Sequence, residues 1–216
     1  MDKPSLADLR ENYTKAGLDS KDVDTNPFHQ FQNWMDMAIG SDIVEPNAMT
    51  LATADADGLP SSRIVLLKHF DENGFCFFTN YNSRKGKDLA INPNASLTIH
   101  WKELERQISI RGTVEKTSKE ESENYFHMRP HQSQLGAIAS DQSQPVIDRP
   151  TLLQREQELL EQYPTGTTVP LPDYWGGYRI TPTYIEFWQG RPSRLHDRIV
   201  YQKGSNSNWS IDRLCP

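Results

Sequence analysis

The chain has 216 residues, 36% of them hydrophobic and 24% charged, which is typical of a globular protein. A formal net charge of −6 argues against a general nucleic-acid or anionic-membrane binder, whose binding surface is basic. We see no apolar leader or membrane span, and the two cysteines lack Cys-x-x-Cys spacing, so the sequence predicts a reduced, cytoplasmic protein. Neither the two cysteines nor the six histidines suggest a metal site, and we expect none.

The N-terminal part predicts a flexible segment followed by a helix. Residues 1–24 are polar and charged, and we expect a flexible segment that precedes a single domain over residues 25–216. Asn26-Pro27 is typical of a helix start, and apolar residues then recur at helical spacing until Gly40. The aromatic residues of this helix fit a core better than cofactor contacts.

After residue 47 the sequence pattern changes from helical spacing of apolar residues to patterns typical of strands. Three strands are predicted, at residues 48–54, 63–68 and 74–80, with turn sequences between them. The four residues between Arg63 and Lys68 are all apolar, so we expect both faces of this strand to be buried. A barrel wall and a subunit interface would each explain that burial.

The next helix, predicted to begin after Ser83 and to end near Pro93, has an unusual first turn. Ser83 is a good N-cap, but Arg84 and Lys85 place two positive charges beside the positive end of the helix dipole. A bound anion would reverse this repulsion and accept hydrogen bonds from free backbone N–H groups. We therefore favour a phosphate site over a solvated basic turn, although the chain has no Walker loop.

The central region predicts two more strands and a capped helix. The strands cover residues 95–101 and 107–116, and Ser118 opens a capping box at the start of the helix. Tyr125 and Arg129 are four residues apart and share one helix face. A tyrosine hydroxyl beside a guanidinium can hold a phosphate, but the spacing alone favours an amphipathic packing pair.

The C-terminal third predicts a helix and then strands. Residues 131–148 form a loop or short helix, residues 150–163 form a helix, and Tyr174–Gly177 marks a bend. Four strands are predicted after that bend, at residues 178–180, 184–189, 194–201 and 209–213. The chain therefore fits a mainly antiparallel β class with helices (α+β), and we expect a barrel with helices packed around it.

Charged residues fall at every second position of the strand predicted over residues 194–201. In an extended chain, Arg194, His196 and Arg198 would share one face, where like charges repel. An anionic ligand facing them would remove the conflict, whereas an exposed edge strand would use the charges to prevent edge pairing. The stretch alone leaves both interpretations open.

The motifs of the whole chain occur in an order that resembles a known family. They are Arg63-Ile-Val-Leu-Leu-Lys68, Phe-Phe-Thr-Asn80, Ser-Arg-Lys85, Glu-Arg-Gln107, Tyr-Phe-x-x-Arg-Pro130, Trp-Gly-Gly-Tyr178, Glu-Phe-Trp-Gln189 and Arg-Leu-His-Asp-Arg198. Together they resemble the pyridoxamine (pyridoxine) 5′-phosphate oxidase family, and the closing Ile-Asp-Arg-Leu-Cys-Pro216 looks like that family's C-terminus. The resemblance covers nearly the whole chain from about Arg10.

The resemblance implies a fold and a reaction. The fold would be an FMN-binding split β-barrel, with a C-terminal dimerisation and active-site region, and the protein would be a homodimer with FMN at the subunit interface. The reaction would oxidise pyridoxamine 5′-phosphate and pyridoxine 5′-phosphate to pyridoxal 5′-phosphate. A hydride would pass from C4′ of the substrate to N5 of FMN, and O2 would reoxidise the flavin with release of H2O2.

The resemblance also implies a role for each matching residue. FMN contacts would come from Arg63, Ile64, Val65, Leu66, Leu67, Lys68, Phe78, Thr79, Arg84, Lys85, Gln107, Gln142, Ser143, Trp188 and Arg198. Substrate contacts would come from Arg10, Tyr13, Lys68, Tyr125, Arg129, Ser133, Arg194, Leu195 and His196. Within these sets, Arg63, Arg84 and Lys85 would hold the FMN phosphate. Arg194 and His196 would be the catalytic residues beside C4′.

Three other functions fit parts of this pattern. Another split-barrel flavoprotein, such as a flavin reductase, would keep the FMN residues without needing the substrate residues. A carrier of FMN or pyridoxal phosphate would bind its ligand but release no peroxide, and a structural dimer module would purify colourless. We favour the oxidase because motifs for the flavin and for the substrate occur together.

Overall fold

The computed structural model describes residue 5, residue 7 and residues 12–216. Its contacts divide the chain into two compact units. Unit 1 comprises Met1–Met49, Leu97–Arg111 and Pro182–Pro216, and unit 2 comprises Thr50–Ser96 and Gly112–Thr181. Within the described residues, no helix combines the length and the apolar character that crossing a membrane requires.

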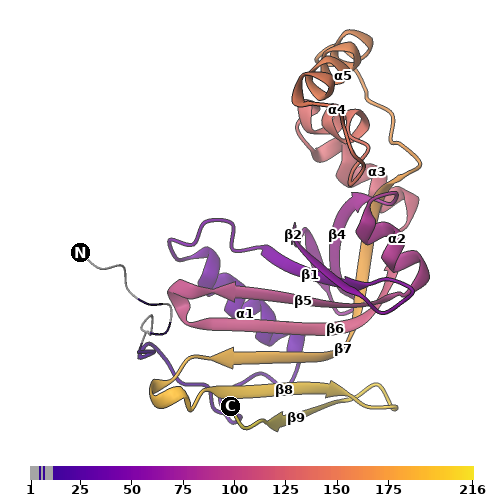
Figure 1. Cartoon of the computed structure of the whole chain (residues 1–216). Coiled ribbons are helices and arrows are strands. Elements are labelled where there is room, and N and C mark those ends of the chain that lie inside the picture. Colours follow the sequence, from indigo (N-terminus) through magenta and orange to yellow (C-terminus); the bar gives the residue numbers. More distant parts are fainter. Residues whose placement is uncertain (1–4, 6, 8–11) are drawn as a thin grey trace. The chain divides into compact units, whose positions relative to one another are not determined.

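The described residues contain nine strands in one sheet (Figure 1). Their bounds are Ala48–Ala54 (β1), Pro60–Leu66 (β2), His69–Asp71 (β3), Gly74–Asn80 (β4), Asn94–Trp101 (β5), Arg106–Lys116 (β6), Trp175–Gln189 (β7), Asp197–Lys203 (β8) and Trp209–Arg213 (β9). The order is β2-β1-β5-β6-β7-β4-β3, with β8 paired to β7 and β9. The β3–β4, β4–β7, β7–β8 and β8–β9 pairs are antiparallel, which agrees with the predicted mainly antiparallel β class. Four strands, β1, β5, β6 and β7, contribute residues to both units. Because the contacts divide the chain into two units, a single domain over residues 25–216 stays a prediction.

Five α-helices lie in the part of the chain that the structure describes. Their bounds are Pro27–Ile39 (α1), Arg84–Ile91 (α2), Lys119–Met128 (α3), His131–Ala139 (α4) and Arg149–Gln162 (α5). The predicted caps are confirmed, because Asn26, Ser83 and Ser118 each accept a hydrogen bond from a backbone N–H of the helix that follows. The segment predicted as a loop or short helix after residue 130 forms α4.

In unit 1, α1 supplies the aromatic core that the sequence predicts. Phe31 and Trp34 of α1 are buried, and Trp34 meets Phe187 of β7 edge to face, with 5.2 Å between ring centroids. On the next strand, Tyr201 is fully buried and its hydroxyl donates a hydrogen bond to the carbonyl of Asp24. These contacts fix the end of β7 and the start of β8, where the catalytic residues were predicted.

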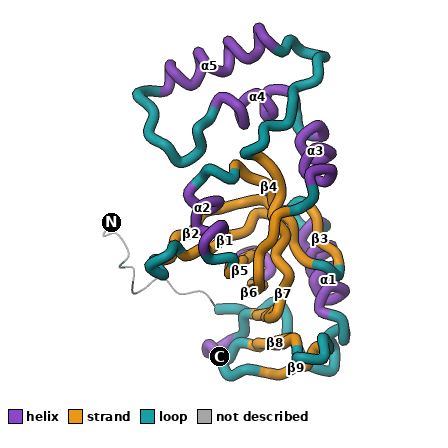
Figure 2. The backbone as a smooth tube through the Cα atoms, turned by 90° about the vertical axis from the view of Figure 1, so that its right-hand side faces the viewer, coloured by secondary structure: helices purple, strands orange, loops and turns teal. Residues whose placement is uncertain are grey.

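In unit 2, helices α3, α4 and α5 cluster at one end of β4, and Figure 2 shows α4 and α5 running side by side. Their core contains Phe126, Leu135, Val169 and Trp175, all buried. The capping box predicted at Ser118 is present and fixes where α3 begins. The helical cluster therefore holds the C-terminal end of α3 against the start of β7.

The bend predicted at Tyr174–Gly177 is wrong, because β7 runs without interruption from Trp175 to Gln189. Gly176 and Gly177 are extended and pair with β4. A Cβ on Gly176 would overlap the hydroxyl of Tyr81, and one on Gly177 would overlap Thr117. The two glycines therefore permit a close approach of neighbouring chains rather than a turn.

The burial predicted for residues 63–68 is also wrong in part. The strand is Pro60–Leu66, and Ile64 is 65% exposed, so a barrel wall within this chain does not cover it. Of residues 63–68, only Leu67, just after the strand, is buried. The short strand β3 was not predicted. The alternative explanation for the apolar run, a subunit interface, stays a prediction.

The strand predicted over residues 194–201 begins three residues later, at Asp197. Before it, Pro192–Arg194 forms a short 3-10 turn in which Ser193 and Arg194 have φ of 56° and 62°. Those angles belong to the left-handed region and exclude an extended chain. The charged residues of this stretch therefore do not alternate along a single strand, and that prediction is wrong.

Candidate active site

A cavity of about 650 Å³ opens in unit 2, a size that suits a cofactor or a substrate. The predicted residues that line it are Ile64, Val65, Leu66, Lys68, Phe78, Thr79, Lys85, Tyr125, Arg129, Ser133 and Gln142. Residues predicted to contact FMN and residues predicted to contact the substrate phosphate are thus brought together. They come from the β2 end, β4, α2, α3, α4 and the loop after α4.

Lys85 lies in the first turn of α2 with its side chain buried beside the cavity. Its ammonium donates hydrogen bonds to Thr79 Oγ1 (3.1 Å), Ser83 Oγ (3.3 Å) and Gln142 Oε1 (3.4 Å). These acceptors are uncharged, and among the described residues no carboxylate lies within ion-pair distance of Lys85. Burial, with the nearby charge of Arg63, lowers the pKa of Lys85 to about 8.

An aromatic stack and a guanidinium form another wall of the cavity. Phe78 stacks on Tyr125 with 4.0 Å between ring centroids, and Trp175 continues the stack. The guanidinium carbon of Arg129 lies 4.7 Å from the Trp175 ring centroid. Its Nη1 is buried and has no hydrogen-bond partner in the described region, and burial lowers the pKa of Arg129. An anion in the cavity would satisfy this donor.

Four of the FMN residues predicted in unit 2 do not line the cavity: Arg63, Leu67, Arg84 and Ser143. The guanidinium of Arg63 donates to Thr53 Oγ1 (2.7 Å) and Ser61 Oγ (2.5 Å). It also lies 3.9 Å from the carboxylate of Asp88. The single carboxylate at this distance compensates its charge only in part. Arg84, in contrast, is exposed at the start of α2.

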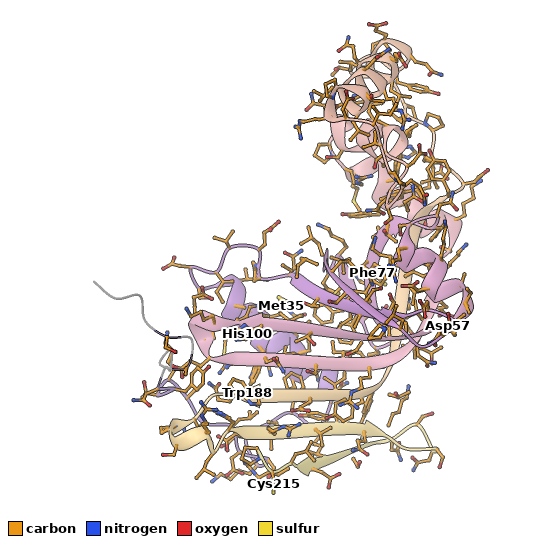
Figure 3. All side chains as sticks on the ribbon, viewed as in Figure 1. Met35, Asp57, Phe77, His100, Trp188 and Cys215 are labelled. Atoms are coloured by element: carbon orange, nitrogen blue, oxygen red, sulfur yellow. The ribbon has the colours of Figure 1, made fainter. Side chains whose placement is uncertain are left out.

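In unit 1, Trp188 near the end of β7 (Figure 3) forms an aromatic group with His196 and Tyr13. The Trp188 and His196 ring centroids are 4.6 Å apart. Tyr13 meets both rings edge-on, at 5.7 Å from Trp188 and 5.6 Å from His196. The fold thus brings three predicted residues together, while Arg10, predicted to act with Tyr13, lies outside the described residues.

His196 has a defined hydrogen bond on one ring nitrogen. The backbone N–H of Arg191 donates to His196 Nδ1 at 3.1 Å. A nitrogen that accepts a hydrogen bond carries no proton, so the neutral ring holds its proton on Nε2. Burial, with the neighbouring charge of Arg194, lowers the pKa of His196, so the neutral form is favoured at neutral pH.

Arg198 is paired within unit 1 rather than turned toward a cluster of like charges. Its guanidinium makes two hydrogen bonds to the Glu186 carboxylate, at 2.7 and 3.0 Å. The Tyr184 hydroxyl donates to the same carboxylate at 2.5 Å. Burial alone would raise the pKa of Glu186, but hydrogen bonds from Arg198 and Tyr184 hold it below its ordinary value. The repulsion expected from the sequence is therefore removed without a ligand.

The remaining predicted residues of unit 1 are more open. Arg194 is exposed, and Leu195 is 70% exposed. Gln107 on β6 is half-buried, and its amide donates to Ser109 Oγ at 3.4 Å. These side chains can reach a ligand, but their contacts within the described residues do not identify one.

Sequence reasoning missed several residues that shape these regions. Trp175 and Asn80 line the cavity, and Arg191, Asp197 and Glu186 hold the residues around His196 and Arg198. Trp175 lies in the Trp-Gly-Gly-Tyr178 motif, where the sequence pattern predicts a bend. Glu186 and Arg198 were two separate motifs, and only the β7–β8 register, which pairs Trp188 with Arg198, places them together.

Comparison with known proteins assigns the chain to a family. A family model described as pyridoxamine 5′-phosphate oxidase matches residues 36–163, which is more than half of the chain. The chain belongs to the pyridoxamine 5′-phosphate oxidase family. A second model, described as the pyridoxine 5′-phosphate oxidase C-terminal dimerisation region, matches residues 175–216 and supports a homodimer. Enzymes of this family depend on FMN.

Curated relatives match over almost their whole length. A pyridoxine/pyridoxamine 5′-phosphate oxidase of Paraburkholderia phymatum is 58% identical, over 98% of this chain and 99% of the relative. One of Nostoc punctiforme is 56% identical over the full length of both chains, 100% of each. The resemblance inferred from the motifs is thereby confirmed.

Solved structures confirm the split-barrel fold of this oxidase family. A crystal structure of PhzG from Burkholderia lata 383, in complex with tetrahydrophenazine-1-carboxylic acid, has a TM-score of 0.86 and 33% identity. The match covers 91% of this chain and 95% of PhzG. A pyridoxamine 5′-phosphate oxidase-related, FMN-binding protein of Nostoc punctiforme matches with a TM-score of 0.70 and 15% identity, over 88% of this chain and 98% of that one. The second match speaks for the fold alone.

The cavity of unit 2 fits a phosphate-bearing cofactor such as FMN. It has the required volume and three cations (Lys68, Lys85 and Arg129) that form no ion pair with a carboxylate among the described residues, and Arg129 carries an unpartnered donor. The α2 start adds backbone N–H groups beside Lys85. Gly86 lies in this first turn against the carbonyl of Tyr81, where any side chain would overlap that carbonyl.

Proposed function

We propose that this protein is a pyridoxine/pyridoxamine 5′-phosphate oxidase (EC 1.4.3.5) that produces pyridoxal 5′-phosphate. The observation that carries the proposal is 58% identity over nearly the full length of a relative with that name. The cavity of unit 2 supports it, because uncompensated cations there suit phosphorylated ligands. The expected cytoplasmic location and the use of O2 as oxidant belong to the same proposal.

FMN would be held mainly from unit 2. Lys85 and the backbone at the start of α2 would bind its phosphate, and residues 64–68 with Thr79 would line the flavin. Arg63 and Arg84 would take part through their positive charge near α2. When bound, FMN supplies a hydride acceptor that O2 can reoxidise, with release of H2O2.

The substrate phosphate would be held by Lys68, Tyr125, Arg129 and Ser133. Arg129 offers the unpartnered Nη1, and its packing on Trp175 fixes the direction of the guanidinium fork. Lys68 is exposed, with its ammonium 6.0 Å from the Tyr125 ring centroid, and is free to turn toward a ligand. These groups would orient the substrate and exclude bulk water from one side of it.

Arg194 and His196 would act on the substrate ring and its C4′ carbon. The neutral His196 ring carries its proton on Nε2, so it can donate one hydrogen bond from that atom. Arg194 brings a positive charge that would favour electron-rich substrate atoms. The homodimer, with FMN at the interface between subunits, completes the proposal.

The test is to purify the protein, record its flavin spectrum, and add pyridoxamine or pyridoxine 5′-phosphate. We expect a yellow protein that forms aldehyde and H2O2 in equal amounts. Flavin retention without peroxide would instead indicate a carrier, and a colourless protein that FMN does not restore would reject the proposal.

The catalytic assignment has its own test. Under anaerobic conditions, Arg194→Met and His196→Gln are each expected to slow flavin bleaching by substrate while leaving the flavin bound. Undiminished bleaching in both variants would reject their role.

A further inference from the structure

Residues 13–18, here called the N-terminal strap, are bound to unit 1 by backbone hydrogen bonds. The N–H groups of Thr14 and Lys15 both donate to Glu105 Oε2, at 2.9 and 3.0 Å. The N–H of Leu18 donates to Asp197 Oδ2 at 3.0 Å. Because these bonds use the backbone of the strap, they fix its path whatever its side chains are.

The side chain of Arg191 joins the strap to the loop that carries His196. Its Nη1 donates to the carbonyl of Ala16 at 2.8 Å. Its Nε lies 3.4 Å from Asp197 Oδ2, the same oxygen that accepts from Leu18. A side chain at residue 17 would crowd this guanidinium, since a Cβ there would lie 3.2 Å from Nη1.

The backbone of the same residue fixes His196. The N–H of Arg191 is the donor to His196 Nδ1, at 3.1 Å. Between the two residues, Ser193 and Arg194 both adopt the left-handed conformation, which non-glycine residues hold only when their surroundings impose it. The loop therefore depends on anchors at its ends, and Arg191 is the anchor on the side of β7.

The strap also contacts His196 directly. The Tyr13 ring packs against His196 and against Gly190, where a Cβ would lie 2.7 Å from Tyr13 Cγ. Arg213 makes a second link between the strap and Asp197, because it donates to Asp197 Oδ1 at 2.6 Å and to the Leu18 carbonyl at 2.8 Å. This link, here called the parallel clamp, does not involve the backbone of the loop. Arg191 and Arg213 thus share the strap and Asp197, but only Arg191 also bonds His196.

We propose that Arg191 is a positioning residue, whose side chain, held by the strap and Asp197, keeps its N–H on His196 Nδ1. In this way a docked strap would select the His196 tautomer that carries its proton on Nε2. The inference rests on the proposed function, in which His196 contacts the substrate. The sequence does not predict this role for Arg191, because the hydrogen bond to His196 comes from the backbone N–H and not from the side chain.

The test uses the FMN-loaded, full-length protein with 15N-labelled histidine. His196→Gln identifies the signals of His196, and the ring nitrogen shifts report the tautomer. In the wild type we expect an unprotonated Nδ1 and a protonated Nε2. In Arg191→Met we expect a mixture of tautomers and a turnover number lowered roughly tenfold, as for one lost hydrogen bond, with a smaller change in KM.

Two further variants separate positioning from general strap docking. Arg191→Lys retains a cation that can reach Ala16 or Asp197, and we expect it to restore the wild-type tautomer. Arg213→Met removes the parallel clamp and is expected to leave the His196 tautomer unchanged. An unchanged tautomer in Arg191→Met, or equal disturbance in Arg213→Met, would overturn the proposal. A wild type that does not oxidise pyridoxamine 5′-phosphate would reject the proposed function, and the tautomer comparison would still decide this inference.

Discussion

The cavity of unit 2 and the β7–β8 region of unit 1 differ in whether their positive charges have carboxylate partners. In the cavity, Lys85 has only uncharged acceptors, and Arg129 has a buried nitrogen without any partner among the described residues. In the β7–β8 region, Arg198 makes two hydrogen bonds to Glu186, and Asp197 forms ion pairs with Arg191 and Arg213. Both regions contain arginines that the sequence suggested as ligand contacts.

The difference follows from what each charge costs when no ligand is present. A buried cation without a carboxylate loses solvation and gains little in return, so its retention points to a ligand that restores the balance. A cation paired with a carboxylate is already compensated, and its contribution is to hold the chain in one conformation. The charges of the cavity therefore favour binding of an anion, whereas those of the β7–β8 region hold side chains in position.

The largest expected effect comes from Arg129→Met. We expect kcat/KM for pyridoxamine 5′-phosphate to fall by about 100-fold, because charge-assisted bonds to the phosphate are lost. Folding stability should be unchanged or higher, since an unpartnered charge is replaced by an apolar chain of similar length. Steady-state kinetics and urea unfolding measure the two quantities. Arg155→Met, at an exposed pair with Asp141, is the control, and a large stability loss at Arg129 would break the comparison.

The next effect concerns Lys85, whose pKa of about 8 makes the cavity charge sensitive to pH. The ammonium is charged below that value, so FMN binding should weaken as pH rises above 8, by up to about tenfold per pH unit. Lys85→Met should bind FMN more weakly at pH 7, by roughly tenfold, and without this pH dependence. Flavin fluorescence titration of the FMN-free protein measures the affinity. Lys87→Met, two residues along α2 and exposed, should behave as the wild type.

The third prediction concerns folding stability in unit 1 rather than ligand binding. Glu186→Gln should lower the free energy of unfolding by about 2 kcal/mol at pH 7, because Arg198 loses its carboxylate. The pKa of Glu186 is held below its ordinary value of 4.5, so the stabilisation is full above that pH and is lost as pH falls below it. Wild type and variant should therefore converge in acid. Asp141→Asn, at an exposed pair, should cost less than about 1 kcal/mol.

Local signals allowed much of the fold to be predicted. Helices α1, α2 and α3 begin where the sequence predicted, because a cap is a contact between residues two or three positions apart. The continuity of β7 could not be predicted, because a Gly-Gly pair permits a bend and a close approach equally well. Only the packing of Tyr81 and Thr117 against these glycines decides between them.

The sequence could predict which residues belong to the site, but not which of them contact one another. Tyr125 and Arg129 were recognisable on one helix face, yet the stack with Phe78 and Trp175 needs residues from distant segments. The left-handed turn at Ser193 and Arg194 has no sequence signal, since neither residue is glycine. Anchors outside the turn impose it, and they too are distant in sequence.

The uninterrupted β7 strand has a consequence for building chimeras of this enzyme with its relatives. Residues 164–174 separate the two regions that match family models, and a junction there looks like a natural point of exchange. The chain after this junction contains the strand segment Trp175–Ile180, which pairs with β4 in unit 2. It also contains the C-terminal part of unit 1. A graft at this point would therefore transplant one wall of the unit 2 cavity, including Trp175, together with the His196 loop. A chimera made at that junction would carry both the Trp175 wall and the His196 loop of the donor, and neither could be exchanged alone.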